Sequence, residues 1–329
     1  MNPTSARTGQ RGRFARQALK LAAGTAIAQG LTLLAAPVLT RVYNPEAFGI
    51  AALFQSLVGI IAAVSCLRYE MAIMLPASDR RAADMFGLSL VLTVMVSAVT
   101  VLPAVFAAGP IARALNSPGI APWIWLVPVG ILLGGFTLAF NNWETRTGRF
   151  GRLSVARVAA AITTVGAMLF LGLAGRPSGG SRIVAMVLGS LAFCILIGSL
   201  VWRDDRGLLR GAVSRLGILA GARRFRRFPV FDTWSTLMNA ISWQLPALLL
   251  SRFFSTAVVG HYALGFRTLQ LPMSLVGTAI GQVFFRRAAI ARHEGRLAGL
   301  VENAFGQLAK LGLFPLLLLS LVGRELFLF

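Results

Sequence analysis

Residues 40–49 read TRVYNPEAFG and residues 251–260 read SRFFSTAVVG, and each is a short polar break between two long apolar runs. In both stretches an Arg (Arg41, Arg252) is followed eight residues later by a Gly (Gly49, Gly260) and four residues further on by a Leu. The two copies are 211 residues apart, counted from Arg41 to Arg252. This spacing predicts an internal repeat, and the repeat in turn predicts how the rest of the chain is divided.

The composition indicates a membrane protein. The 329 residues are 56% hydrophobic and 13% charged, with a mean hydropathy of +0.73, whereas a soluble domain carries roughly 25% charged residues. About 20 apolar residues are needed to cross a hydrocarbon layer of about 30 Å. Nine runs approach or exceed that length, and the first is too long for a cleavable signal peptide. We therefore expect spans near 21–40, 47–67, 85–107, 120–140, 158–175, 183–202, 233–251, 256–285 and 303–323.

The net charge of +21 would suggest nucleic-acid binding in a soluble protein. With the N-terminus in the cytoplasm and nine alternating spans, 24 of the 32 Lys and Arg residues fall in inner segments and five in outer ones. This asymmetry is the positive-inside rule. The charge therefore predicts orientation, with a cytoplasmic N-terminus, and nucleic acid is not an expected partner.

The repeat predicts how the chain is organised. One copy joins the first two spans and the other joins the seventh and eighth, so an even number of spans separates them and both face the same side. We expect an all-α bundle of two six-helix lobes. The predicted parts are a basic cytoplasmic tail (1–17), the first lobe (18–202), a basic cytoplasmic linker (203–229) and three helices of a second lobe (230–329). Such a plan predicts twelve spans, so we expect the second lobe to be incomplete.

Three stretches carry a family resemblance. They are TRVYNPEAFGIAALFQS (40–56), LRYEMAIMLPASDRRAADMFGLS (67–89) and the long segment that runs from FPVFDTWSTL to GQVFFRRAA (228–289). They resemble the polysaccharide transporter family, the O-antigen and exopolysaccharide repeat-unit flippases within the superfamily of multidrug, oligosaccharidyl-lipid and polysaccharide exporters. The resemblance runs from about residue 18 to the end.

The resemblance implies a function and its partners. Such proteins have two six-helix lobes around a central cavity. They move a polyprenyl-diphosphate-linked oligosaccharide from the inner to the outer leaflet of the bacterial inner membrane by alternating access. The implied partners are that lipid, membrane lipids and a glycan polymerase or other assembly protein. No cofactor is expected, and the sequence does not assign a coupling ion, H⁺ or Na⁺.

A flippase for a diphosphate needs buried cations, and arginine donates paired hydrogen bonds to phosphate while staying charged. Arg267 lies about eleven residues into the eighth predicted span, where an ionisable residue is a functional candidate unless it snorkels to the interface. Arg41 and Arg252 lie at matched positions at the outer mouth, where they either attract the diphosphate or anchor helix ends. Lys310, in the ninth span, either binds the diphosphate or snorkels inward.

Other polar residues leave two interpretations open. Arg68 and Glu70 follow the second span, and residues two apart do not face each other on a helix. We therefore expect each to pair with another helix at a cytoplasmic gate, or to be structural, and not to pair with each other. Four amides in predicted spans bond either sugars in a cavity or neighbouring helices: Gln29, Asn239, Gln244 and Gln270.

The acidic residues and the outer loops separate rival functions. The interiors of five predicted spans contain no Asp or Glu, and Asp84 and Glu144 lie at span ends. A multidrug exporter for cations is expected to bury a carboxylate, so an anionic substrate is favoured. A glycan polymerase or ligase would need charged outer loops, and these are short and nearly uncharged. A peptidoglycan-precursor flippase and an inactive, truncated remnant are the remaining alternatives.

Two residue types have structural interpretations. Cys66 and Cys194 lie in apolar runs, so we expect buried free thiols instead of a disulfide. Tryptophans near the predicted span ends, Trp143 among them, are typical of an aromatic belt at the membrane interface.

Overall fold

The computed structural model describes residues 3–175, 177–212 and 215–266, together with the single positions 269, 306, 313 and 317. The chain forms two compact units, Met1–Gly265 and Phe266–Phe329, and the elements and contacts described below belong to the first. The candidates Arg267, Gln270 and Lys310 lie outside the described residues, as do most of the eighth predicted span and nearly all of the ninth.

Every regular element among the described residues is helical. The long helices are α1 (Pro3–Val42), α2 (Pro45–Ala62), α4 (Asp79–Phe106), α6 (Val127–Arg146), α7 (Phe150–Leu173), α8 (Gly179–Ala212) and α10 (Thr233–Phe253). The short ones are α3 (Tyr69–Ala72), α5 (Ala108–Ala114), a 3₁₀ helix η1 (Pro118–Leu126), α9 (Arg215–Arg224) and a π-helical turn η2 (Phe228–Asp232). A further helix covers residues 256–266.

Among the described residues, six helical segments are long and apolar enough to cross a membrane, and they match the first six predicted spans in order. They are Ala22–Val42, Pro45–Ala62, Asp79–Phe106, Pro118–Arg146, Phe150–Leu173 and Gly179–Leu209. The prediction of an all-α, polytopic bundle is confirmed. The seventh predicted span coincides with α10, a 21-residue helix that is not among these six.

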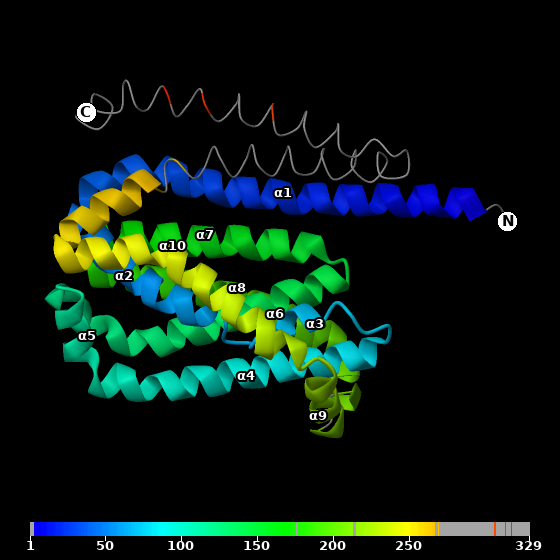
Figure 1. Ribbon diagram of the computed structural model, residues 1–329. Coiled ribbons are helices and arrows are strands. Elements are labelled where there is room, and N and C mark those ends of the chain that lie inside the picture. The colour runs from blue at the N-terminus through cyan, green and yellow to red at the C-terminus, as the bar shows by residue number, and fades with distance from the viewer. Residues whose placement is uncertain are drawn as a thin grey trace. The chain divides into compact units, whose positions relative to one another are not determined.

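Successive long helices run in opposite directions, so the connections between them gather at two ends of the bundle (Figure 1). We call the end with residues 43–44, 107–126, 174–175, 177–178 and 254–255 the turn end. The end with residues 63–78, 147–149, 203–212 and 215–232 is the basic end. In Figure 1 the turn end lies at the left, where α2, α5 and the end of α10 meet.

Two of the three apolar clusters in the described part of the chain lie toward opposite ends of the bundle. One lies toward the basic end around Phe86, Trp143 and Ile197, and the other lies toward the turn end around Leu53 and Ile131. Helix α6 contacts α2, α4 and α8, while α1 packs along α7. Small residues allow the close approach of α6 and α2, because a Cβ at Gly130 would lie 2.7 Å from Val58 and one at Gly134 2.8 Å from Ala62.

Helix α8 continues past the predicted end of the sixth span at residue 202, as far as Ala212. In this extension Asp205 and Asp204 form ion pairs with Arg149 and Arg152 at the start of α7. Part of the segment predicted as a linker is therefore an extension of α8, followed by α9.

Candidate functional site

The first repeated stretch forms the turn between α1 and α2. The backbone N–H of Tyr43 donates to the Leu39 carbonyl (2.9 Å) and closes α1. The Asn44 side chain then caps α2 by accepting from the Ala47 N–H (2.9 Å), and Pro45 occupies the first turn of the new helix. The interpretation of Asn44 and Pro45 as turn residues is confirmed.

The second stretch builds the same turn with different residues. The Phe254 N–H donates to the Leu250 carbonyl (3.0 Å) and closes α10, and the Ser255 hydroxyl accepts from the Val258 N–H (3.3 Å) at the start of the next helix. Each donor and acceptor lies 211 residues after its counterpart in the first turn. These bonds thus recur at the spacing of 211 residues that separates Arg41 from Arg252.

The two turns pack against each other at the turn end. A Cβ at Gly49 would overlap the carbonyl oxygen of Thr256, and a Cβ at Gly260 would overlap the carbonyl oxygen of Pro45 and lie 3.1 Å from the Gly49 backbone nitrogen. Thr256 is the counterpart of Pro45, so the contact is reciprocal. We call these four residues the paired-turn contact. Both glycines are required because backbone lies where any side chain would begin.

Helices α2 and α10 also contact each other further from the turn end. The Ser56 hydroxyl donates to the Gln244 side-chain oxygen (3.0 Å), and a Cβ at Gly59 would lie 2.7 Å from the Gln244 nitrogen. Gln244 thus bonds a neighbouring helix, one of the two interpretations left open by the sequence.

A buried arginine anchors the first turn. The Arg182 guanidinium, on α8, stacks 3.6 Å from the ring centroid of Phe48 and 5.2 Å from that of Tyr43. The Tyr43 hydroxyl donates to the Met168 carbonyl (2.7 Å). The charge count from the sequence placed Arg182 in an outer loop, and this is wrong, because it is a helical residue that is 4% exposed. A single sequence gives no signal for such stacking.

The expectation that Arg68 and Glu70 do not pair with each other is wrong, whereas Arg68 does pair with a residue of another helix, as expected. The Arg68 guanidinium donates to Glu70 (3.0 Å) and to Asp232 (2.8 Å), the last residue before α10. Arg68 has a φ of 62°, outside the helical region, so the rule for helical spacing does not apply and the two side chains meet. Glu70 is 1% exposed, and its burial raises the pKa of the carboxyl, although Arg68 opposes the shift.

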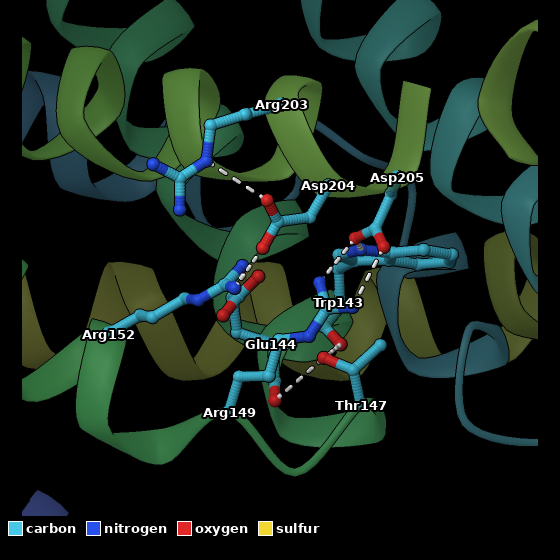
Figure 2. A network of polar contacts seen from close by, with 8 residues as sticks. All are labelled: Trp143, Glu144, Thr147, Arg149, Arg152, Arg203, Asp204 and Asp205. Atoms are coloured by element: carbon cyan, nitrogen blue, oxygen red, sulfur yellow. Dashed lines mark hydrogen bonds and ion pairs between the residues drawn. The ribbon is translucent and has the colours of Figure 1, made fainter. Parts of the chain in front are cut away.

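A second charged network joins α6, α7 and α8 at the basic end (Figure 2). Arg149 donates two hydrogen bonds to Asp205 (2.6 and 2.9 Å), which also accepts from the Trp143 indole N–H (2.9 Å). Arg152 pairs with Asp204. Asp205 raises the pKa of Arg149. Trp143 is 1% exposed, so its assignment to an interfacial belt is wrong. Its indole instead holds Asp205 from the buried side of the network.

Several carboxylates at the basic end are buried. Glu144 is 0% exposed, and neither of its carboxylate oxygens has a hydrogen-bond partner in the described part of the chain. Asp84 and Asp205 are also buried. Asp84 and Glu144 lie in the end turns of α4 and α6, as the sequence indicated, but inside the packed bundle. The lack of acidic residues therefore holds for the middle of these helices only.

The remaining candidates are dispersed. Arg41 and Arg252 are exposed in the last turns of α1 and α10, beside the paired-turn contact. Asn239 is exposed on α10 and Gln29 is half-buried on α1. A cavity of about 550 Å³ at the basic end is lined by Met74, Asp79, Arg146 and Thr147, none of them a predicted site residue. Both cysteines are buried free thiols, as predicted.

One charged residue inside the bundle was misplaced by the sequence pattern. Arg157 was counted among inner-loop charges, but α7 begins at Phe150 and places it two turns into a membrane-spanning helix. Its guanidinium bonds Thr25 of α1 and Asn141 of α6. The signal was available in principle, since Arg157 directly precedes the predicted span.

Comparison with known proteins gives one match. The family model described as "Polysaccharide biosynthesis protein" matches residues 38–328 and thus includes both repeated stretches. No curated protein and no solved structure matches the chain.

Proposed function

Because the chain belongs to the polysaccharide biosynthesis protein family, we propose that it is a flippase for polyprenyl-diphosphate-linked oligosaccharide repeat units of O-antigen or exopolysaccharide. It carries them from the inner to the outer leaflet of the bacterial inner membrane by alternating access. Two findings support the proposal: the family acts in polysaccharide biosynthesis, and most of the described chain consists of helices that can span a membrane. A lipid-linked sugar made on one side must cross the bilayer, since its charged and polar parts are insoluble in hydrocarbon.

The paired-turn contact is the observation that carries the mechanism. Alternating access needs two repeated units that close on each other at one end and separate there in another state. Here the equivalent turns of two repeats meet through backbone and two glycines. With the N-terminus in the cytoplasm, as the charge distribution favours, the turn end faces outward and the paired-turn contact closes the exit.

The opposite end holds a different link between the same two regions. Arg68, which follows α2, is bonded to Asp232, which precedes α10. A charge pair can exchange its partners for water or for substrate, so we assign Arg68 and Glu70 to the inner gate. Substrate contacts are proposed for Arg41 and Arg252 at the exit and for Arg267 and Lys310 in the spans predicted from the sequence. Gln29, Asn239 and Gln270 are proposed to bond sugars.

The proposal is tested by deleting the full-length gene in its host. Lipid-linked repeat units should then accumulate on the cytoplasmic leaflet, and surface polysaccharide should disappear. The unchanged gene should restore export, whereas one with Gly260→Leu, which places a side chain against the Pro45 backbone, should not. Normal surface polysaccharide after deletion would refute the flippase function. Altered drug resistance with normal polysaccharide would instead indicate a multidrug exporter, and loss of lipid-linked peptidoglycan precursor export would indicate the precursor flippase.

A further inference from the structure

Arg157 lies where three helices of the first unit meet. It is half-buried on α7, about 10 Å along the helix axis from Phe150 at a rise of about 1.5 Å per residue. One guanidinium nitrogen donates to the Thr25 hydroxyl (2.8 Å) and another to the Asn141 side-chain oxygen (3.2 Å). The Asn141 nitrogen donates to the Thr137 carbonyl (2.7 Å), and this bond turns the amide oxygen toward Arg157.

The partners of Arg157 orient its charge without neutralising it. Helices α1 and α7 contain no Asp or Glu, and the only acidic residue of α6 is Glu144. The carboxylate of Glu144 accepts no hydrogen bond from the described residues. A guanidinium has five N–H donors, and Thr25 and Asn141 take two of them in the described part of the chain.

The neighbouring arginines show what a purely structural arginine looks like in this bundle. Arg146, Arg149 and Arg152 lie on the same helical hairpin, and each forms an ion pair with an aspartate, namely Asp79, Asp205 and Asp204. Arg157 lies deeper than these three and has neutral partners instead. An unneutralised charge inside a membrane protein is costly and marks a functional site by default.

We propose that Arg157, held by Thr25 and Asn141, binds the phosphate group of a membrane lipid. The planar guanidinium matches phosphate oxygens with paired, charge-assisted hydrogen bonds. Because the residue lies in a membrane-spanning helix, the phosphate is one that enters from the bilayer. Its source is the diphosphate of the transported lipid, which rests on the proposed function, or the headgroup of an anionic phospholipid.

The test measures lipid binding to the purified full chain in nanodiscs of a zwitterionic lipid. The probes are an undecaprenyl diphosphate and phosphatidylglycerol, each titrated separately. Arg157→Gln should weaken binding of the phosphate lipid by about 10-fold or more, since charge-assisted bonds are lost. Arg157→Lys keeps the positive charge but loses the paired N–H donors of the planar guanidinium, so it should retain part of the affinity. Arg152→Gln is the matched control on the same helix and should change affinity by less than about 2-fold.

The outcomes separate the two sources and the two proposals. Loss of diphosphate binding alone assigns the site to the transported lipid, and equal loss for phosphatidylglycerol assigns it to a resident phospholipid. Unchanged affinity for both probes in a folded Arg157→Gln chain would overturn the site. If that variant does not fold, Arg157→Lys decides: a phosphate site predicts a partial loss of affinity for at least one probe, and unchanged affinity for both would overturn it. Binding is measured without transport, so a chain that binds but does not export refutes only the flippase.

Discussion

The two repeated turns share a backbone plan and differ in how they are anchored. In both, the helix ends one residue after an arginine, a polar side chain caps the next helix, and a glycine meets the other turn. Yet Tyr43 is 2% exposed beneath Arg182, whereas its counterpart Phe254 is 64% exposed. The repeat therefore preserves positions that shape the backbone, and it leaves the side chains around them free to differ.

The anchors indicate which turn is easier to release. The first turn is held by stacking on a buried arginine. The second is held by hydrogen bonds to the connection between α5 and η1, where Asn116 donates to the Phe254 carbonyl (3.4 Å) and Ser251 to the Leu115 carbonyl. The Asn116 bond is exposed, unlike that of the buried Ser251, and an exposed hydrogen bond exchanges readily with water. We therefore expect the second turn to move away from the first when the exit opens.

The largest expected effect comes from the glycines of the paired-turn contact. Gly49→Ala and Gly260→Ala each force a methyl group against a backbone carbonyl, and such overpacking costs about 1–3 kcal/mol or more. Thermal unfolding in detergent measures it. Gly166→Ala is the matched control, because that helical glycine has open space around it and alanine favours helix by up to about 1 kcal/mol. Equal losses at all three positions would mean that the two turns are not in contact.

Removal of the first anchor should have the next largest effect. Arg182→Met keeps the length of the side chain but loses the interaction with Phe48 and Tyr43, which is worth about 2 kcal/mol when desolvated. Asn116→Ala removes one exposed bond from the second turn and should cost less than about 1 kcal/mol. The comparison of unfolding free energies would reject the proposed asymmetry if Asn116→Ala proved the more damaging of the two.

The link at the basic end should depend on pH. Burial raises the pKa of Glu70, so the folded state binds this proton more tightly than the unfolded state does. The stability that the proton contributes is present below the unfolded pKa, about 4.3, and is lost as pH rises through the folded pKa. Glu70→Gln should therefore be at least as stable as the unchanged chain near neutral pH, and this relative advantage should shrink in acid. A constant difference between the two unfolding curves across that range would contradict the shift.

The helix caps should have the smallest effect. Asn44→Ala removes a cap bond of 2.9 Å and Ser255→Ala one of 3.3 Å, and loss of a cap costs about 1 kcal/mol. Chemical denaturation should show the larger loss for Asn44→Ala, since the shorter bond is the stronger. The reverse order would mean that the second turn depends more on its cap than the first.

The sequence predicted the elements that depend on local pattern. Apolar run length located the first six spans, and Asn44 with Pro45 located the turn. The errors concern residues whose role depends on the backbone or on distant neighbours. Arg68 and Glu70 meet because Leu67 and Arg68 leave the helical region, and Arg182 and Trp143 are buried by partners far away in the chain. A charge count cannot distinguish an arginine in a loop from one buried in a helix.

The opening of the exit is tested most directly by the distance across the paired-turn contact. Spin labels at Glu46→Cys and Phe253→Cys, both exposed positions beside the two turns, would report it by electron paramagnetic resonance in lipid, with the buried native cysteines replaced. We predict a short and a long distance whose proportions shift when the polyprenyl-diphosphate-linked oligosaccharide is added. A single short distance that the lipid leaves unchanged, in a chain that exports, would contradict the claim that this contact opens during transport.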